Sequence, residues 1–139
     1  MKYPCSAYDK VGGIVYFARM LDKIRLKASG ELPAAYHKNL GVGLFDAQCC
    51  RFLGASYASV VDQVGKGGTD DEILLWCFDT GRKPHDEDIL IWNAFMTKKG
   101  FRDDYTDHLN RFKVEGGLSD RNEIQTLFDY YEFDEGREK

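Results

Sequence analysis

Apolar residues recur every three or four positions along most of this chain, which is the spacing of one face of an α-helix. The first such segment covers residues 13–29 and repeats through Ile14, Phe17, Leu21, Ile24 and Ala28. Arg19, Asp22 and Lys23 fall on the other side of the same segment. The pattern therefore predicts an amphipathic first helix that buries its apolar face and ends at Gly30, because glycine commonly follows the last turn of a helix.

The rest of the chain repeats this pattern in shorter segments that start at capping residues. Ser56 and Thr69 each precede an apolar-periodic stretch, and Thr69 is followed by Glu72, which makes a capping box. The predicted helices cover 46–53, 56–64, 69–80, 86–99 and 105–116, and a last one is capped by Ser119 and extends past Tyr131. No segment has a convincing strand pattern, because residues 14–17 fit the helical period better.

These segments predict an all-α fold in one compact domain over residues 1–139. About six or seven mostly short helices are expected to pack around a longer N-terminal helix. Residues 1–8 and 134–139 are expected to be frayed ends. Residues 30–45 are the longest stretch without a period, and such loops in compact domains often carry function. We expect this loop to lie over one end of the first helix.

Composition narrows the class of protein further. No apolar run approaches the about 20 residues that are needed to span a membrane, and no apolar leader follows Met1, so we expect a soluble cytoplasmic protein without a membrane partner. The four cysteines are expected to be free thiols, since nothing indicates export. The three histidines are far apart and GKGG at 65–68 does not match a phosphate-binding loop, so we expect neither a metal nor a cofactor.

Charge is unevenly distributed along the chain. Residues 1–30 hold six basic and two acidic side chains, a balance of +4, whereas the whole chain carries −4. An acidic chain without a dense basic patch argues against nucleic-acid binding. The asymmetry could steer an anion to one face, pair two copies head to tail as a homodimer, or simply reflect solvated helix faces.

Two groups of residues could carry chemistry. Arg19, Lys23 and Lys27 follow one another on successive turns of the first helix, and this row could meet phosphates or a carboxylate, or be a solvated face. Cys49 or Cys50 could act as a nucleophile, with Arg51 adjacent and His37 upstream. The acidic clusters at predicted helix starts are explained by the helix dipole without any function.

Several stretches resemble a family of bacterial proteins known only as domain of unknown function 5069. The resemblance lies in GGIVYFARMLDKIRLKASGEL, FDAQCCRFLG, TDDEILLWC, GRKPHDEDILIWNAFM and SDRNEIQTLFDYYEFDEGR, which together cover most of the chain. It implies a compact helical domain and no assigned activity. It also implies that the recurring polar positions are Arg19, Asp22, Lys23, Arg25, Asp46 and Arg51.

The sequence leaves the function open among three hypotheses. The first is a binding or interaction module whose polar site lies where Arg19 and Lys23 meet the 30–51 segment. The second is a small enzyme that uses Cys49 or Cys50 with His37, or a carboxylate such as Asp46. The third is a homo-oligomeric structural protein held together by faces of opposite charge.

Overall fold

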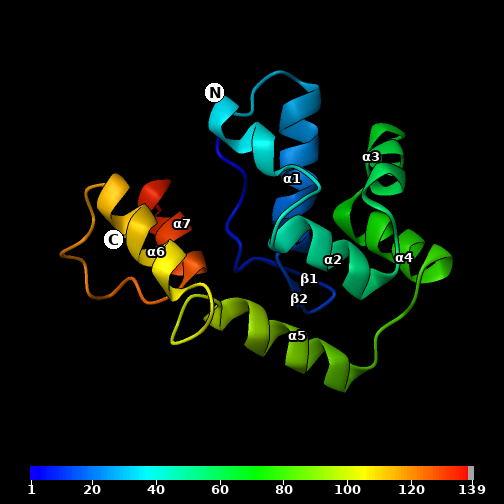
Figure 1. Cartoon of the computed structure of the whole chain (residues 1–139). Helices are drawn as coiled ribbons and strands as arrows, with labels where there is room; N and C mark the ends of the chain where they lie inside the picture. Colours follow the sequence, from blue (N-terminus) through cyan, green and yellow to red (C-terminus); the bar gives the residue numbers. More distant parts are fainter. Residues whose placement is uncertain (138–139) are drawn as a thin grey trace.

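A computed structural model describes residues 1–137 of the chain. In this range the chain forms seven α-helices, one 3-10 helix (η1) and one two-stranded hairpin (Figure 1). In chain order the elements are β1 (Lys10–Val11), β2 (Ile14–Val15), α1 (Phe17–Ala28), η1 (Ala34–Asn39), α2 (Phe45–Leu53), α3 (Tyr57–Gly65), α4 (Asp70–Thr80), α5 (Asp86–Lys98), α6 (Thr106–Glu115) and α7 (Leu127–Asp134). The prediction of a mostly helical protein is confirmed.

The start of the first helix was predicted wrongly. Ile14 and Val15 form strand β2, which pairs with β1 through a turn at Gly12 and Gly13, and α1 begins only at Phe17. Both glycines have positive φ, which a two-residue hairpin turn requires. The strand is held by α5, because the backbone N–H of Val15 donates to Asn93 Oδ1 at 3.1 Å. Consequently α1 has 12 residues, one fewer than α5, and is not the longest helix.

Helices with local capping signals begin where the sequence predicted. The Ser56 hydroxyl accepts a hydrogen bond from the Ser59 N–H at 3.2 Å and starts α3. Thr69 and Glu72 form the reciprocal capping box at the start of α4. Each cap satisfies backbone donors that would otherwise have no partner in the first turn.

The helix predicted to begin at Ser119 does not form there. Residues 119–126 follow an irregular path, and α7 begins after Thr126, whose hydroxyl accepts from the Asp129 N–H at 3.1 Å. The Leu127 N–H donates to the Lys99 carbonyl at 2.9 Å, which ties the beginning of α7 to the end of α5. A local cap at Thr126 and a tertiary contact with the end of α5 therefore both mark this boundary.

Parts of the two segments that were expected to fray make specific contacts. Ser6 and Ala7 are buried at the N-terminal end, and Glu135 is buried after α7. Arg137 donates from its guanidinium to the Pro4 carbonyl at 3.1 Å, so the two ends meet. Residues 138–139 of the predicted frayed tail lie outside the described residues.

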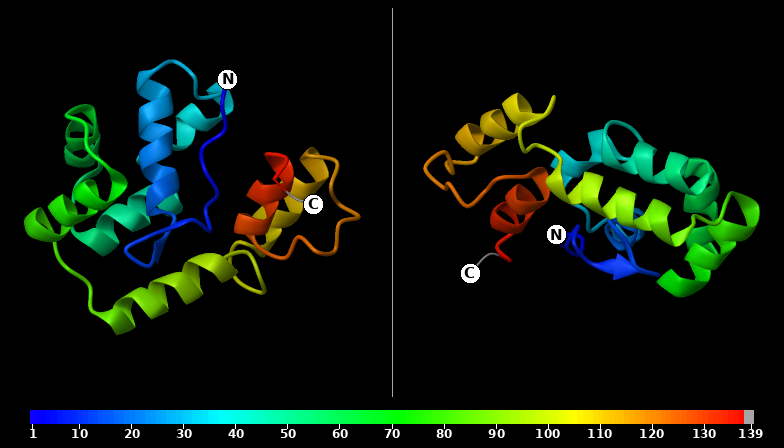
Figure 2. Two further views of the ribbon diagram at one scale, coloured as in Figure 1. Left: turned by 180° about the vertical axis from the view of Figure 1, so that it is seen from behind. Right: turned by 90° about the horizontal axis from the view of Figure 1, so that it is seen from below.

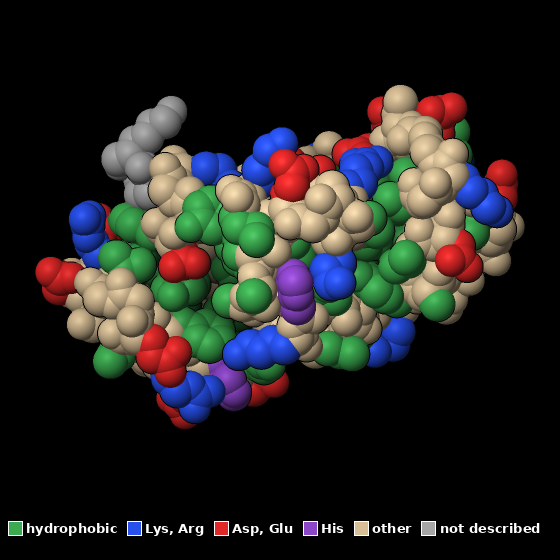
Figure 3. All heavy atoms as spheres, turned by 90° about the horizontal axis from the view of Figure 1, so that it is seen from above, with side chains coloured by type: hydrophobic (Ala, Val, Ile, Leu, Met, Phe, Trp, Pro, Cys, Tyr) green, Lys and Arg blue, Asp and Glu red, His purple; other side chains and the backbone are tan. Residues whose placement is uncertain are grey.

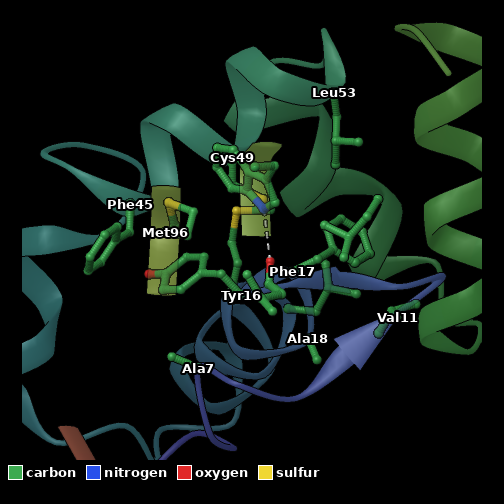
Figure 4. Close-up of a cluster of buried hydrophobic side chains, with 14 of the residues drawn as sticks. Ala7, Val11, Tyr16, Phe17, Ala18, Phe45, Cys49, Leu53 and Met96 are labelled. Carbon is green, nitrogen blue, oxygen red and sulfur yellow. Dashed lines mark hydrogen bonds between the residues drawn. The ribbon is translucent and has the colours of Figure 1, made fainter. Parts of the chain in front are cut away.

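The elements are arranged along α5. Figure 2 shows α5 running under the molecule, with α6 and α7 at one end and α3 and α4 toward the other. Helix α1 packs mainly against α3 and β1, whereas α7 packs against α5 and α6. A single buried cluster joins these parts, and Figure 4 shows Tyr16, Phe45, Cys49 and Met96 converging within it.

No helix within residues 1–137 is both long enough and apolar enough to cross a bilayer.

Candidate functional site

A pocket of about 360 Å³ opens between two parts of the molecule that are distant in sequence. One wall comes from η1, the following loop and α2, and the other comes from α6 and α7, while α1 supplies Arg19 and Lys23. A volume of this size is within the range of sites for small organic ligands, about 300–1,000 Å³. The pocket lies beside the irregular 30–45 segment, which was the region that the sequence singled out.

The polar end of the pocket is a buried network of three side chains. Lys23 Nζ lies 2.7 Å from Asp46 Oδ1 and donates to the Tyr16 hydroxyl at 2.8 Å. The same hydroxyl donates to Asp46 Oδ1 at 2.6 Å, so the phenol bridges the two charges. Asp46 is only 1% exposed, and its Oδ2 accepts the Gly41 N–H at 2.9 Å, which fixes the loop before α2.

A second buried ion pair lies behind the pocket. Arg19 donates two hydrogen bonds to the Glu135 carboxylate, at 2.8 and 2.7 Å, in the two-point geometry that favours arginine. Its guanidinium also lies 4.6 Å from the ring centre of Tyr131. Tyr36 and Arg137 donate to the same carboxylate, so η1, α1 and the segment after α7 meet at Glu135.

Burial and neighbouring charges shift the pKa values of these groups in opposite directions. Burial lowers the pKa of Lys23, although Asp46 opposes that change. Burial raises the pKa of Tyr16 well above its usual value, and Asp46 raises it further. Burial favours the neutral form of Glu135, but the hydrogen bonds and charge of Arg19 outweigh it and hold the pKa of Glu135 below its usual value. Perturbed groups beside a cavity are typical of functional sites.

Aromatic rings make up most of the remaining wall. They come from η1, α2, the loop before α6, α6 itself and α7, and they are Tyr36, Phe45, Tyr105, Phe112, Tyr130 and Tyr131. Phe45 and Tyr131 meet edge to face, with ring centres 6.1 Å apart and planes at 81°. Within residues 1–137, the hydroxyls of Tyr105, Tyr130 and Tyr131 make no hydrogen bond, so they are available to a bound molecule.

The structure brings three of the predicted site residues to this pocket, namely Arg19, Lys23 and Asp46. Asp22 does not line the pocket, and it accepts the Cys5 N–H at 3.0 Å. Arg25 pairs with Asp70 at 2.7 Å and holds α1 against the start of α4.

The last two predicted residues also lie outside the pocket lining. His37 is exposed on η1, and its Nε2 lies 3.1 Å from the Leu32 carbonyl oxygen. Arg51 is exposed on α2. The neighbour of His37 on η1, Tyr36, lines the pocket instead. Sequence reasoning missed Tyr36 and Glu135, because their roles depend on contacts across 99 and 116 positions.

The surroundings of the cysteines do not favour a thiolate nucleophile. All four thiols are free, as predicted, and Cys49, Cys50 and Cys77 are buried. Burial raises the pKa of Cys50 and of Cys77 to about 11, and it raises the pKa of Cys49 well above its usual value. Within residues 1–137, no group of three or more His, Cys, Asp or Glu side chains is placed to hold a metal ion.

Fold and site together define a small, mostly helical protein with an aromatic-walled pocket over a buried charged network. The chain belongs to the family described as "Domain of unknown function (DUF5069)", which matches residues 1–137. The resemblance seen in the sequence is thereby confirmed. No curated protein matches the chain.

Proposed function

We propose that this protein binds a small organic molecule in the pocket between α1, η1, α2 and the α6–α7 pair. The observation that carries the proposal is the position of the Lys23–Tyr16–Asp46 network at the wall of a pocket of about 360 Å³. A binding module with its polar site at the first helix and the 30–51 segment was also the leading hypothesis from the sequence.

Energetic reasoning supports this proposal. Taking charges out of water costs several kcal/mol per ion, and apolar side chains of similar size often stabilise a core equally well. Two buried ion pairs beside one cavity are therefore poorly explained by stability alone. Perturbed polar groups combined with apolar, aromatic walls are the usual composition of a ligand site.

The pocket is also open to solvent, as a binding site for a ligand must be. Ala35 and Val42 line the pocket from exposed positions, so a ligand can reach it between η1 and α2. Tyr36 fastens η1 to Glu135 and keeps this rim in place. Within the proposal the protein works in the cytoplasm, where free thiols stay reduced.

A thermal-shift screen of small cationic, neutral and anionic fragments tests the proposal. Wild type is compared with Ala35→Trp, which places an indole in the mouth of the pocket and leaves both buried ion pairs intact. Ala58→Trp is the matched control, since Ala58 is exposed on α3 and does not line the pocket. We expect fragments that raise the melting temperature of wild type and of A58W but not of A35W.

The proposal fails if no fragment stabilises wild type. It also fails if A35W and A58W respond equally, because binding would then occur away from this pocket.

A further inference from the structure

Both cations of the pocket are already neutralised within the protein. Lys23 pairs with Asp46 at 2.7 Å, and Arg19 pairs with Glu135 at 2.7 Å. Both carboxylates are almost fully buried, so their attraction to the cations is weakly screened. An anionic ligand would have to compete with these partners. The row of basic residues on α1 therefore does not favour a phosphate or carboxylate ligand.

One acidic side chain at the pocket has no such partner. Asp134 lines the pocket at the end of α7, and within residues 1–137 it makes no ion pair or hydrogen bond. Partial burial raises the pKa of Asp134, and the neighbouring negative charge of Glu135 raises it further. The charge of Arg19 acts in the opposite direction, but Arg19 is already paired with Glu135. The exposed carboxylate of Asp134 can therefore accept a positive group of a ligand.

The rings of the pocket already accept cations. Within the protein, Arg19 lies over Tyr131 at 4.6 Å, Lys23 over Tyr16 at 5.3 Å and Lys99 over Tyr105 at 5.4 Å from the ring centres. Neighbouring rings in the pocket wall also lie at steep angles to one another, as the edge-to-face pair of Phe45 and Tyr131 shows. Electron-rich faces around one cavity form the arrangement that recognises quaternary and protonated amines.

We infer that the ligand of this pocket is an organic cation, with its ammonium group against the tyrosine rings and Asp134 and its apolar part against Phe45 and Phe112. This inference rests on the proposed function and narrows it to one chemical class. The charge balance of the site supports this inference. The Arg19–Glu135 and Lys23–Asp46 pairs are neutral overall, and the Asp134 carboxylate remains as a charge that a ligand can reach.

Isothermal titration with three probes of similar size tests the inference. The probes are benzyltrimethylammonium, benzyl alcohol and phenylacetate, which carry a positive charge, no charge and a negative charge. We expect wild type to bind benzyltrimethylammonium about fivefold or more tightly than either other probe, because cation–π contacts and Asp134 act on it alone.

Variants then assign the preference to named side chains. Asp134→Asn should weaken binding of the cation by about threefold or more and leave benzyl alcohol unchanged. Asp79→Asn is the control, since Asp79 is exposed on α4 and does not line the pocket. Tyr131→Phe should keep most of the affinity because the ring remains, whereas Tyr131→Leu should lose it.

The outcomes separate this inference from the proposed function. Preference for phenylacetate, or a cation preference that Asp134→Asn does not change, overturns the inference. If neutral or anionic fragments bind in a way that Ala35→Trp blocks, the proposed function stands and the inference alone is wrong. If nothing binds, both are wrong.

Discussion

Arg19 and Glu135 are separated by 116 positions in the chain and form a two-point ion pair, with distances of 2.8 and 2.7 Å. The pair joins the first helix to the segment after the last one, and both side chains are almost fully buried. It therefore closes the fold and supports the wall of the pocket at the same time.

Removing the charge of Glu135 should destabilise the protein strongly. Glu135→Gln leaves the Arg19 guanidinium buried without its carboxylate, and breaking a buried pair in this way costs about 3–5 kcal/mol. Arg19→Met should cost less, because Glu135 keeps Arg137 and Tyr36 as partners. Urea unfolding followed by circular dichroism measures both. Glu31→Gln breaks the exposed pair with Lys2 and should leave the stability close to that of wild type.

The same pair should make stability depend on acidity. The pKa of Glu135 is lower in the folded protein than its usual value of 4.5, so the ionised carboxylate favours the folded state. Its contribution is fully present above that usual value and is lost as the pH falls through the folded pKa. The free energies of unfolding of wild type and Glu135→Gln should therefore converge on acidification from about pH 7 to about pH 2. A constant difference over this range would contradict the assignment.

Two glycines should respond to alanine in opposite directions. A Cβ at Gly81 would lie 2.1 Å from the Leu53 carbonyl oxygen, so Gly81→Ala must push apart the contact between the ends of α2 and α4. We expect a loss of at least about 1–3 kcal/mol. Gly65 ends α3 in open space, where alanine should stabilise by up to about 1 kcal/mol. Thermal unfolding measures the change in melting temperature of each variant. Equal changes in the two variants would show that the close contact at Gly81 is absent.

Thiol labelling tests whether a cysteine can act as a nucleophile. Iodoacetamide should modify Cys49, Cys50 and Cys77 slowly in the folded protein at neutral pH, because burial raises the pKa of each thiol. In urea-unfolded protein, all three thiols should react at the rate of an exposed cysteine. Mass spectrometry of peptides assigns each site. A thiol that reacts faster in the folded than in the unfolded protein would revive the cysteine-enzyme hypothesis.

The sequence predicted those elements whose boundaries are set locally. Ser56 and Thr69 bond to donors three residues away, so their helices could be recognised from short motifs. Strand β2 could not be recognised, because the contacts of Val15 with Asn93 on α5 decide its conformation. The beginning of α7 has both kinds of signal, a local cap between Thr126 and Asp129 and the tertiary hydrogen bond between Leu127 and Lys99.

The same distinction applies to the site. Arg19, Lys23 and Asp46 were predicted because charged residues on the first helix adjoin the one long irregular segment. Glu135, the carboxylate partner of Arg19, was not predicted, because it lies in a segment that was expected to fray. Arg19 and Glu135 are 116 positions apart, so only the folded chain shows that they form a pair. Acidic and basic side chains are interspersed on the face in Figure 3, so this face has no patch of a single charge.

Chemical-shift mapping of a bound fragment is the most direct test of the pocket. A ¹⁵N-labelled sample is titrated with the fragment that stabilises wild type most, and the amide shifts are assigned to the structure. We predict that the largest shifts lie within 35–46 and 127–134, the two opposing walls, and that Ala35→Trp abolishes them. Shifts confined to α3, α4 and α5, or no shifts with any fragment, would contradict a ligand site between α1, η1, α2 and the α6–α7 pair.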